Sequence, residues 1–250
     1  FARRSHSDLG RSHQIMTRVV AVVQARMGSQ RFPGKMLSQL GEHTLLDWVL
    51  QRVLRSTQVD QVVLATSTNS EDDKLVSAAL RLEVNSIRGS ETDVLSRFLL
   101  AADDSQADLV VRVCADNPFI APEELDRLII DHRTKNVDYS CNHQQKLSNK
   151  YADGFGAEIF SHDLLKKLAN QTTQQAHREH VTSYIWDNQK EFKINAVTAP
   201  AELAFPEVKL DIDTPAELAV LNEFVRQYSV KIETKAAEIV ESFRKFSAET

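Results

Sequence analysis

Positive charge and glycine are concentrated in one short segment near the start of the chain. The segment VVQARMGSQRFPGK, residues 22–35, carries Arg26, Arg31 and Lys35 together with Gly28 and Gly34. Glycine tolerates positive φ, so successive backbone amides can turn toward one anion. Arginine forks match phosphate oxygens, and lysine adds a point charge. These residue types favour a phosphate-binding loop over the alternative, a basic surface turn.

The spacing within this segment fits neither of two widespread nucleotide-binding loops. The positions of its two glycines match neither the GxxxxGK[ST] pattern nor the GxGxxG pattern. Any phosphate site here is therefore of another kind, with Ser29 as an added hydroxyl.

Two aspartates follow strand-like runs and could complete such a site. Asp116 follows the apolar run that ends at Val113, and Asp213 precedes a helix that begins at Pro215. Ligands of open α/β sheets bind beyond the carboxyl ends of the strands. Magnesium keeps several waters, so two carboxylates and substrate phosphates suffice to hold it. The alternatives are structural: Asp116 could shape the turn before Pro118, and Asp213 could cap the following helix.

Two further charged groups have local explanations. Asp93 and Arg97 lie four residues apart in a helical pattern, where they can form an ion pair. Arg178, Glu179 and His180 begin another helical pattern and could be a solvated first turn. Residue types alone assign neither group to a site.

Strand and helix patterns alternate through the first half of the chain. Val19–Val23 has the uninterrupted β-branched composition of a buried strand. The next expected elements are a helix over 45–54, a strand over 62–65, a helix over 72–82, a strand over 84–87, a helix over 93–102, a strand over 109–113 and a helix over 122–132. This alternation predicts an α/β fold with a mainly parallel sheet and crossover helices.

The second half is less regular. We expect strands at 139–142, 157–160, 192–197 and 208–210, helices over 162–169, 177–188, 215–224 and 232–246, and a mobile polar loop over 144–153. The last helix repeats Ala236, Ile239, Val240 and Phe243 as an apolar stripe. That stripe must be buried on this domain or on a second copy, which suggests a homodimer.

Composition and charge narrow the classes of function. The 250 residues are 42% hydrophobic and 26% charged, which is typical of a folded domain. The net charge of -5 argues against nucleic acid as a partner, because nucleic-acid binders usually carry a basic excess. No segment predicts a membrane span or a signal core, and Cys114 and Cys141 lack the spacing of a zinc site. We therefore expect a cytoplasmic protein without a membrane partner.

Residues 1–15 differ in composition from the rest of the chain. They are rich in His, Ser and Arg, show no periodicity, and precede Met16, a plausible natural start. We interpret residues 1–15 as a tag or disordered arm and residues 16–250 as a single domain. A native arm that packs on a partner is the alternative.

The charged loop closely resembles the opening loop of the sugar cytidylyltransferases, nearest to the spore coat polysaccharide biosynthesis protein F group. The resemblance runs from Val19 to about Val225 and covers several ordered motifs. These are QARMGSQRFPGK (24–35), ATSTNSEDD (65–73), RGSETDVLSRF (88–98), RVCADNP (112–118), REHVT (178–182) and LDIDTP (210–215). Relatives activate deoxy-manno-octulosonate and sialic acid as CMP-sugars. The resemblance implies a Rossmann-like nucleotide-diphospho-sugar transferase fold with a small dimerisation extension.

The resemblance also implies a reaction, partners and residue roles. CTP and a small acidic sugar would give a CMP-sugar and pyrophosphate, with Mg²⁺ as cofactor, in surface polysaccharide or glycan biosynthesis. The implied roles are catalytic for Arg26 and Lys35, nucleotide-binding for Ala25, Gly28, Ser29, Arg31, Asp93 and Arg97, substrate-binding for Gly156, Glu158, Arg178 and His180, and metal-binding for Asp116 and Asp213. Asp211 is a further candidate for the second metal ligand.

The chain departs from the group at three positions. Ala157 stands where relatives usually have an aspartate, a change that could alter which sugar is accepted. Gln30 and Phe32 replace the usual small polar and aliphatic loop residues, while the charged positions remain.

Three other functions stay open. A nucleotidyltransferase for UTP or GTP would typically have a glycine-richer loop with fewer arginines. A glycosyltransferase of similar fold needs an Asp-x-Asp motif, whose letters occur at residues 211–213. A non-catalytic nucleotide-binding domain could retain the loop without turnover. Among sugars, nonulosonic acids, octulosonates and amino sugars are all compatible with the residues.

Overall fold

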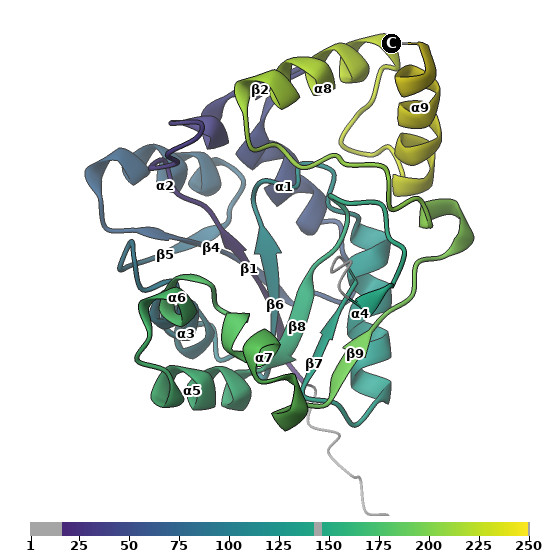
Figure 1. Cartoon of the computed structure of the whole chain (residues 1–250). Helices are drawn as coiled ribbons and strands as arrows, with labels where there is room; N and C mark the ends of the chain where they lie inside the picture. Colours follow the sequence, from purple (N-terminus) through teal and green to yellow (C-terminus); the bar gives the residue numbers. More distant parts are fainter. Residues whose placement is uncertain (1–16, 143–146, 250) are drawn as a thin grey trace, which may run out of the picture.

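Strand β1 (Val19–Gln24) lies inside the sheet, as its β-branched composition predicts. The structure is a computed structural model, and it describes residues 17–142 and 147–249. Within those residues, seven strands form one sheet in the order β5-β4-β1-β6-β8-β7-β9 (Figure 1). The other strands are β4 (Gln61–Ser67), β5 (Asn85–Gly89), β6 (Leu109–Cys114), β7 (Tyr139–Cys141), β8 (Glu158–Ser161) and β9 (Ile194–Ala196).

The sheet is mostly parallel, with one antiparallel strand. β1 pairs in parallel with β4 on one side and with β6 on the other, so their carboxyl ends meet at one edge. β8 runs antiparallel to β6 and β7, and β9 pairs in parallel with β7. The mainly parallel α/β fold expected from the sequence is confirmed.

Helices cover both faces of this sheet (Figure 1). The core on one face includes α1 (Leu45–Val53), α2 (Asp73–Arg81), α4 (Pro122–Thr134), α8 (Pro215–Gln227) and α9 (Ala236–Glu249). The core on the other face includes α3 (Val94–Asp104), α5 (His162–Gln171) and α7 (Ser183–Asp187), and the short α6 (Gln175–Glu179) lies beside α3. Side chains of β1 alternate between the two cores, as the period of a strand requires.

The apolar stripe of the last helix is buried within its own chain. Ala236, Ile239 and Val240 of α9 are buried, and Phe243 is partly buried with its ring packed against Phe224 of α8. Because the stripe is covered here, it supplies no argument for a second copy. The homodimer stays a prediction.

Two expectations for the second half are wrong in detail. The helix expected over 177–188 is two short helices, α6 and α7, because the backbone leaves helical geometry at His180 (φ -108°, ψ 84°). The strand expected at 208–210 is an isolated bridge between Asp153 and Lys209. In the first half of the chain, the structure also has a two-stranded ribbon that the sequence did not predict, β2 (Gln39–Leu40) with β3 (His43–Thr44).

Some expectations fall partly or wholly outside the described residues. Residues 1–15, interpreted as an arm, lie outside them, and the single domain over 16–250 stays a prediction. The loop expected over 144–153 is described from Leu147 onward, where Asn149 and Tyr151 are buried. Of the helices that the structure describes, none combines the length and the apolar character needed to cross a membrane.

Buried Arg52 of α1 ties the C-terminal segment to the core. Its Nε donates to the Ile120 carbonyl at 2.7 Å, and its Nη1 donates to the carbonyls of Ile232 and Thr234 at 2.7 and 2.9 Å. A buried carbonyl that loses its donor costs free energy. This guanidinium therefore stabilises the link between α1 and the segment before α9.

We expect Arg52→Met to lower the free energy of unfolding by about 3 kcal/mol, because three carbonyls lose their donor. Arg55→Met is the matched control, since Arg55 is exposed and lies 3.8 Å from Glu233. Urea unfolding followed by circular dichroism measures both variants. Equal midpoints for the two variants would contradict the role of Arg52.

Candidate active site

A cavity of about 680 Å³ lies at the carboxyl ends of β1 and β6. Its walls come from the loop after β1, the end of β6, the turn between α6 and α7, and the segment before α8. Eight expected site residues line it: Ala25, Arg26, Ser29, Arg31, Lys35, Asp116, His180 and Asp213.

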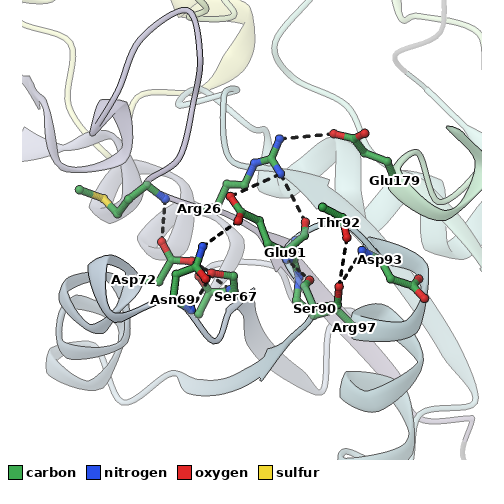
Figure 2. Close-up of polar contacts among 12 residues, drawn as sticks. Arg26, Ser67, Asn69, Asp72, Ser90, Glu91, Thr92, Asp93, Arg97 and Glu179 are labelled. Carbon is green, nitrogen blue, oxygen red and sulfur yellow. Dashed lines mark hydrogen bonds and ion pairs between the residues drawn. The ribbon is translucent and has the colours of Figure 1, made fainter. Parts of the chain in front are cut away.

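A buried carboxylate anchors the loop after β1. The Met27 amide donates to Asp72 Oδ1 at 2.7 Å, and Asp72 also accepts from the amide and hydroxyl of Ser67 (Figure 2). Burial alone would raise the pKa of Asp72, but the hydrogen bonds that it accepts outweigh burial and lower it. Asp72 is therefore ionised and holds the start of the loop in place.

Glycine permits the turn at the far end of the same loop. Gly34 has a φ of 73°, a left-handed conformation that side chains disfavour. Gly28 lines a neighbouring cavity rather than the main one, and a Cβ there would stand 2.9 Å from Glu91 Oε1.

Arg26 contacts two carboxylates from different elements (Figure 2). Its Nη1 lies 4.0 Å from Glu91 Oε1 and donates to the Glu91 carbonyl at 3.3 Å, while Nη2 lies 3.4 Å from Glu179 Oε1. Glu91 also accepts from the Asn69 side-chain amide at 2.7 Å. All three charged side chains are about a third exposed or more, so these ion pairs are weak and exchangeable.

Lys35 joins the opening loop to the segment before α8. Its Nζ donates to the Ile212 carbonyl at 2.7 Å and lies 3.3 Å from Asp213 Oδ1. Arg31 Nη1 lies 2.7 Å from Asp213 Oδ2. The helix α8 is capped by Thr214 instead, so the capping role considered for Asp213 does not hold. The Asp213 carboxylate therefore faces the cations of the loop.

Asp116 lies beside this pair at the end of β6. The Ile212 amide donates to the Asp116 carbonyl at 2.9 Å, which holds the two aspartate-bearing segments together. Burial raises the pKa of the Asp116 carboxyl, the charge of Lys35 opposes that rise, and the charge of Asp213 adds to it. Two carboxylates near enough to interact offer the oxygen ligands that a hard cation such as Mg²⁺ prefers.

A metal at this place would take its remaining ligands from substrate and water. Among the described residues, no group of three or more His, Cys, Asp and Glu side chains is suited to hold a metal. Asp211 lines a separate cavity with Asp153 and Lys209, and burial raises its pKa, with the charge of Asp153 adding to the rise. Asp211 and Asp213 thus line different cavities, and the role of Asp211 as a further candidate for the second metal ligand stays a prediction.

Three of the expected residues, Asp93, Arg97 and Arg178, do not line the cavity. Asp93 caps α3 through its bond from the Ser96 amide, and it lies 3.6 Å from Arg178 Nε. Arg97 is fully buried and donates to the Ser90 carbonyl at 2.9 Å (Figure 2). Burial, with the nearby charge of Arg26, lowers the pKa of Arg97 to about 10. Among the described residues, Asp93 and Arg97 form no direct side-chain ion pair.

Glu158 and Gly156 are also buried and do not line the cavity. Glu158 instead contacts Arg112, a lining residue that sequence reasoning missed, at 2.7 Å. A signal for Arg112 existed, because an arginine inside an apolar strand needs a buried partner. Glu91, Glu179 and Cys114 were missed as well, and burial raises the pKa of the Cys114 thiol to about 12, so that thiol is protonated.

Comparison with known proteins identifies the family. A family model described as cytidylyltransferase matches residues 20–245. The spore coat polysaccharide biosynthesis protein SpsF of Bacillus subtilis (strain 168) is 30% identical over 230 residues, which cover 90% of this chain and 93% of that protein.

Two solved structures share the fold. A cytidylyltransferase from Leptospira borgpetersenii serovar Hardjo-bovis has a TM-score of 0.85 at 29% identity, covering 93% of this chain and 96% of that chain. A CMP:2-keto-3-deoxy-manno-octonic acid synthetase complexed with CTP has a TM-score of 0.64 at 17% identity, covering 84% and 99%, a likeness of fold alone. The family match spans nearly all of the described residues. This chain belongs to the cytidylyltransferase family.

Proposed function

We propose that this cytidylyltransferase transfers CMP from CTP to a hydroxyl group of an acidic sugar, releasing pyrophosphate, with Mg²⁺ as its cofactor. The observation that carries the proposal is the Lys35–Asp213 contact, which brings cations suited to a triphosphate beside carboxylates suited to a metal. The name of the Bacillus subtilis relative supports a role in surface polysaccharide biosynthesis. The CTP complex of the fold neighbour supports CTP and a sugar acid as substrates.

The cations of the opening loop would bind the triphosphate. Arg26, Arg31 and Lys35 line the cavity, and the loop amides near Gly28 and Ser29 would add hydrogen bonds to phosphate oxygens. Charge builds on those oxygens as pyrophosphate leaves, so Arg26 and Lys35 would stabilise the transition state. Glu91 and Glu179 neutralise Arg26 until phosphate oxygens replace them.

Asp116 and Asp213 would hold the metal. Their carboxylates interact, both line the cavity, and the loop cations adjoin them, so these residues fit a hard divalent ion. Bound Mg²⁺ would supply polarisation of the phosphate and a lowered pKa for the attacking hydroxyl. Lys35 would keep Asp213 oriented toward the phosphates.

The remaining expected residues would contact the sugar or the nucleotide, or hold residues that do. His180 lines the cavity on the side of α6 and would contact the sugar, as would Arg178 after release from Asp93. Ala25 would approach the nucleotide through its backbone. Arg97 and Asp93 lie outside the cavity lining and would support the nucleotide side through their bonds to Ser90 and Ser96. We further propose a cytoplasmic homodimer, and the two free cysteines fit a reducing compartment.

A pyrophosphate-release assay tests the proposal as a whole. Protein, Mg²⁺ and a panel of acidic and amino sugars are combined with CTP, UTP, GTP or ATP in turn. Release with CTP and an acidic sugar is expected. Release with another nucleotide alone, or tight CTP binding without any release, would replace the proposal with one of the alternatives.

Asp116→Asn is expected to abolish CMP-sugar formation and to leave the fold intact, because one metal-binding carboxylate loses its charge. Turnover is measured by pyrophosphate release, and folding by thermal denaturation. A variant with near-normal turnover would overturn the metal assignment.

Lys35→Ala is expected to lower the rate by roughly 10²-fold, because a positive charge is lost where negative charge develops. Lys245→Ala serves as the control, since Lys245 lies exposed on α9 and pairs with Glu241. Steady-state kinetics with CTP compare the two variants. Unchanged kinetics for Lys35→Ala would refute its catalytic role.

Removal of divalent metal is expected to stop turnover, and added Mg²⁺ is expected to restore it. The reason is that two carboxylates and a triphosphate repel one another without a cation between them. EDTA treatment followed by titration of Mg²⁺ or Mn²⁺ measures the effect. Full activity in excess EDTA would exclude a metal-dependent reaction.

A further inference from the structure

Arg112 occupies a distinct part of the cavity wall. It lies on β6, where strand alternation places it on the sheet face that carries α3, α6 and α7. Its register partner is Glu158 on β8, and β8 lies on the opposite side of β6 from β1 and its loop. The Arg112 side chain therefore leans away from the phosphate loop, toward the far side of the cavity.

Buried groups fix the position of this guanidinium. Nη1 of Arg112 donates to Glu158 Oε2 at 2.7 Å, and the Glu158 side chain is 1% exposed. The Thr182 hydroxyl lies 3.1 Å from both oxygens of Glu158. Thr182 stands between α6 and α7, two residues after His180, which lines the same cavity. The contact thus links β6, β8 and the α6–α7 turn.

One edge of the guanidinium is left without an acceptor in the described part of the chain. Nη1 serves Glu158, whereas Nε is a buried nitrogen that has no hydrogen-bond partner among the described residues. Nε and Nη2 form the parallel pair of donors that matches two carboxylate oxygens. A buried donor without an acceptor is unfavourable, so a ligand oxygen at this edge would be stabilising.

In-line attack assigns this side of the cavity to the sugar. In phosphoryl-group transfer the attacking and leaving oxygens stand on opposite sides of phosphorus. If pyrophosphate leaves along the loop after β1, the sugar hydroxyl approaches from the opposite side, where Arg112 and His180 lie. The loop cations already face Glu91, Glu179 and Asp213, whereas Arg112 is the lining cation that leans toward β8.

Building on the function proposed above, we propose that Arg112 binds the carboxylate of the acceptor sugar through its Nε–Nη2 edge. Glu158 and Thr182 are positioning residues that hold the guanidinium and do not touch the sugar. The site thus selects sugar acids over neutral sugars. Residues of β6 and β8 thus determine which sugar is accepted, and residues of the loop after β1 determine which nucleotide is bound.

The test compares sugar acids with their uncharged analogues in Arg112 variants. The probes are 3-deoxy-manno-octulosonate and N-acetylneuraminate, each beside its carboxamide, with CTP and Mg²⁺. Arg112→Lys keeps a positive charge beside Glu158 but removes the paired N–H donors of the guanidinium. The double variant Arg112→Gln/Glu158→Gln removes the positive and the negative charge together. Arg226→Gln is the control, because Arg226 is exposed on α8 and pairs with Glu223. Thermal denaturation checks folding, and calorimetry measures CTP binding separately.

The proposal expects the wild type to prefer an acid to its carboxamide. In Arg112→Lys and in the double variant, KM for the acid rises about 10- to 100-fold, KM for the carboxamide stays within twofold, and the Kd for CTP is unchanged. Glu158→Gln produces a smaller rise in KM for the acid and leaves kcat nearly unchanged, as a positioning role requires.

Other outcomes separate the two proposals. Two results would overturn the role of Arg112 and leave the cytidylyl transfer standing. One is that the wild type turns over neutral or amino sugars in preference to sugar acids. The other is that KM rises equally for the acid and its carboxamide in the Arg112 variants. A weakened Kd for CTP in Arg112→Lys would assign Arg112 to a phosphate and also overturn it. Absence of pyrophosphate release with every sugar would overturn the proposed function itself, together with the inference built on it.

Discussion

The site depends on one contact between segments that are far apart in the sequence. The ammonium of Lys35 lies against the Ile212 carbonyl and the Asp213 carboxylate, 177 and 178 residues away. A cation placed between the loop after β1 and an acidic segment keeps both near one point without a bound ligand. Because the Ile212 amide also bonds the Asp116 carbonyl, the same contact gathers the loop after β1, the end of β6 and the start of α8.

Charge compensation explains how such a polar cavity is stable before substrates bind. Arg26 faces Glu91 and Glu179, Arg31 and Lys35 face Asp213, and Arg112 faces Glu158. Most of these pairs are partly exposed, so each contributes little stability by itself. The pair of Arg112 with Glu158 is the most buried of them, so its geometry is the most constrained.

Local pattern predicted the main strands and helices of the first half and the charged loop after β1, because β-branched runs and charged, glycine-containing turns leave short-range signals. It predicted one helix where the structure has α6 and α7, because the residues between them include neither Gly nor Pro to mark a break. Arg112 was missed because its contact with Glu158 joins residues 46 positions apart, and Glu158, expected at the cavity from the resemblance, is buried beside Arg112. Asp116 and Asp213 were expected together by resemblance, and the contacts of Ile212 give the physical reason for their proximity.

A crystal structure with CTP and Mn²⁺, with the metal located by its anomalous scattering, tests the central claim most directly. The account predicts one metal between the carboxylates of Asp116 and Asp213 and the phosphates, at oxygen distances of about 2.1 Å. It also predicts the triphosphate on Arg26, Arg31 and Lys35. A metal bound elsewhere, or a triphosphate that does not touch this loop, would contradict the account.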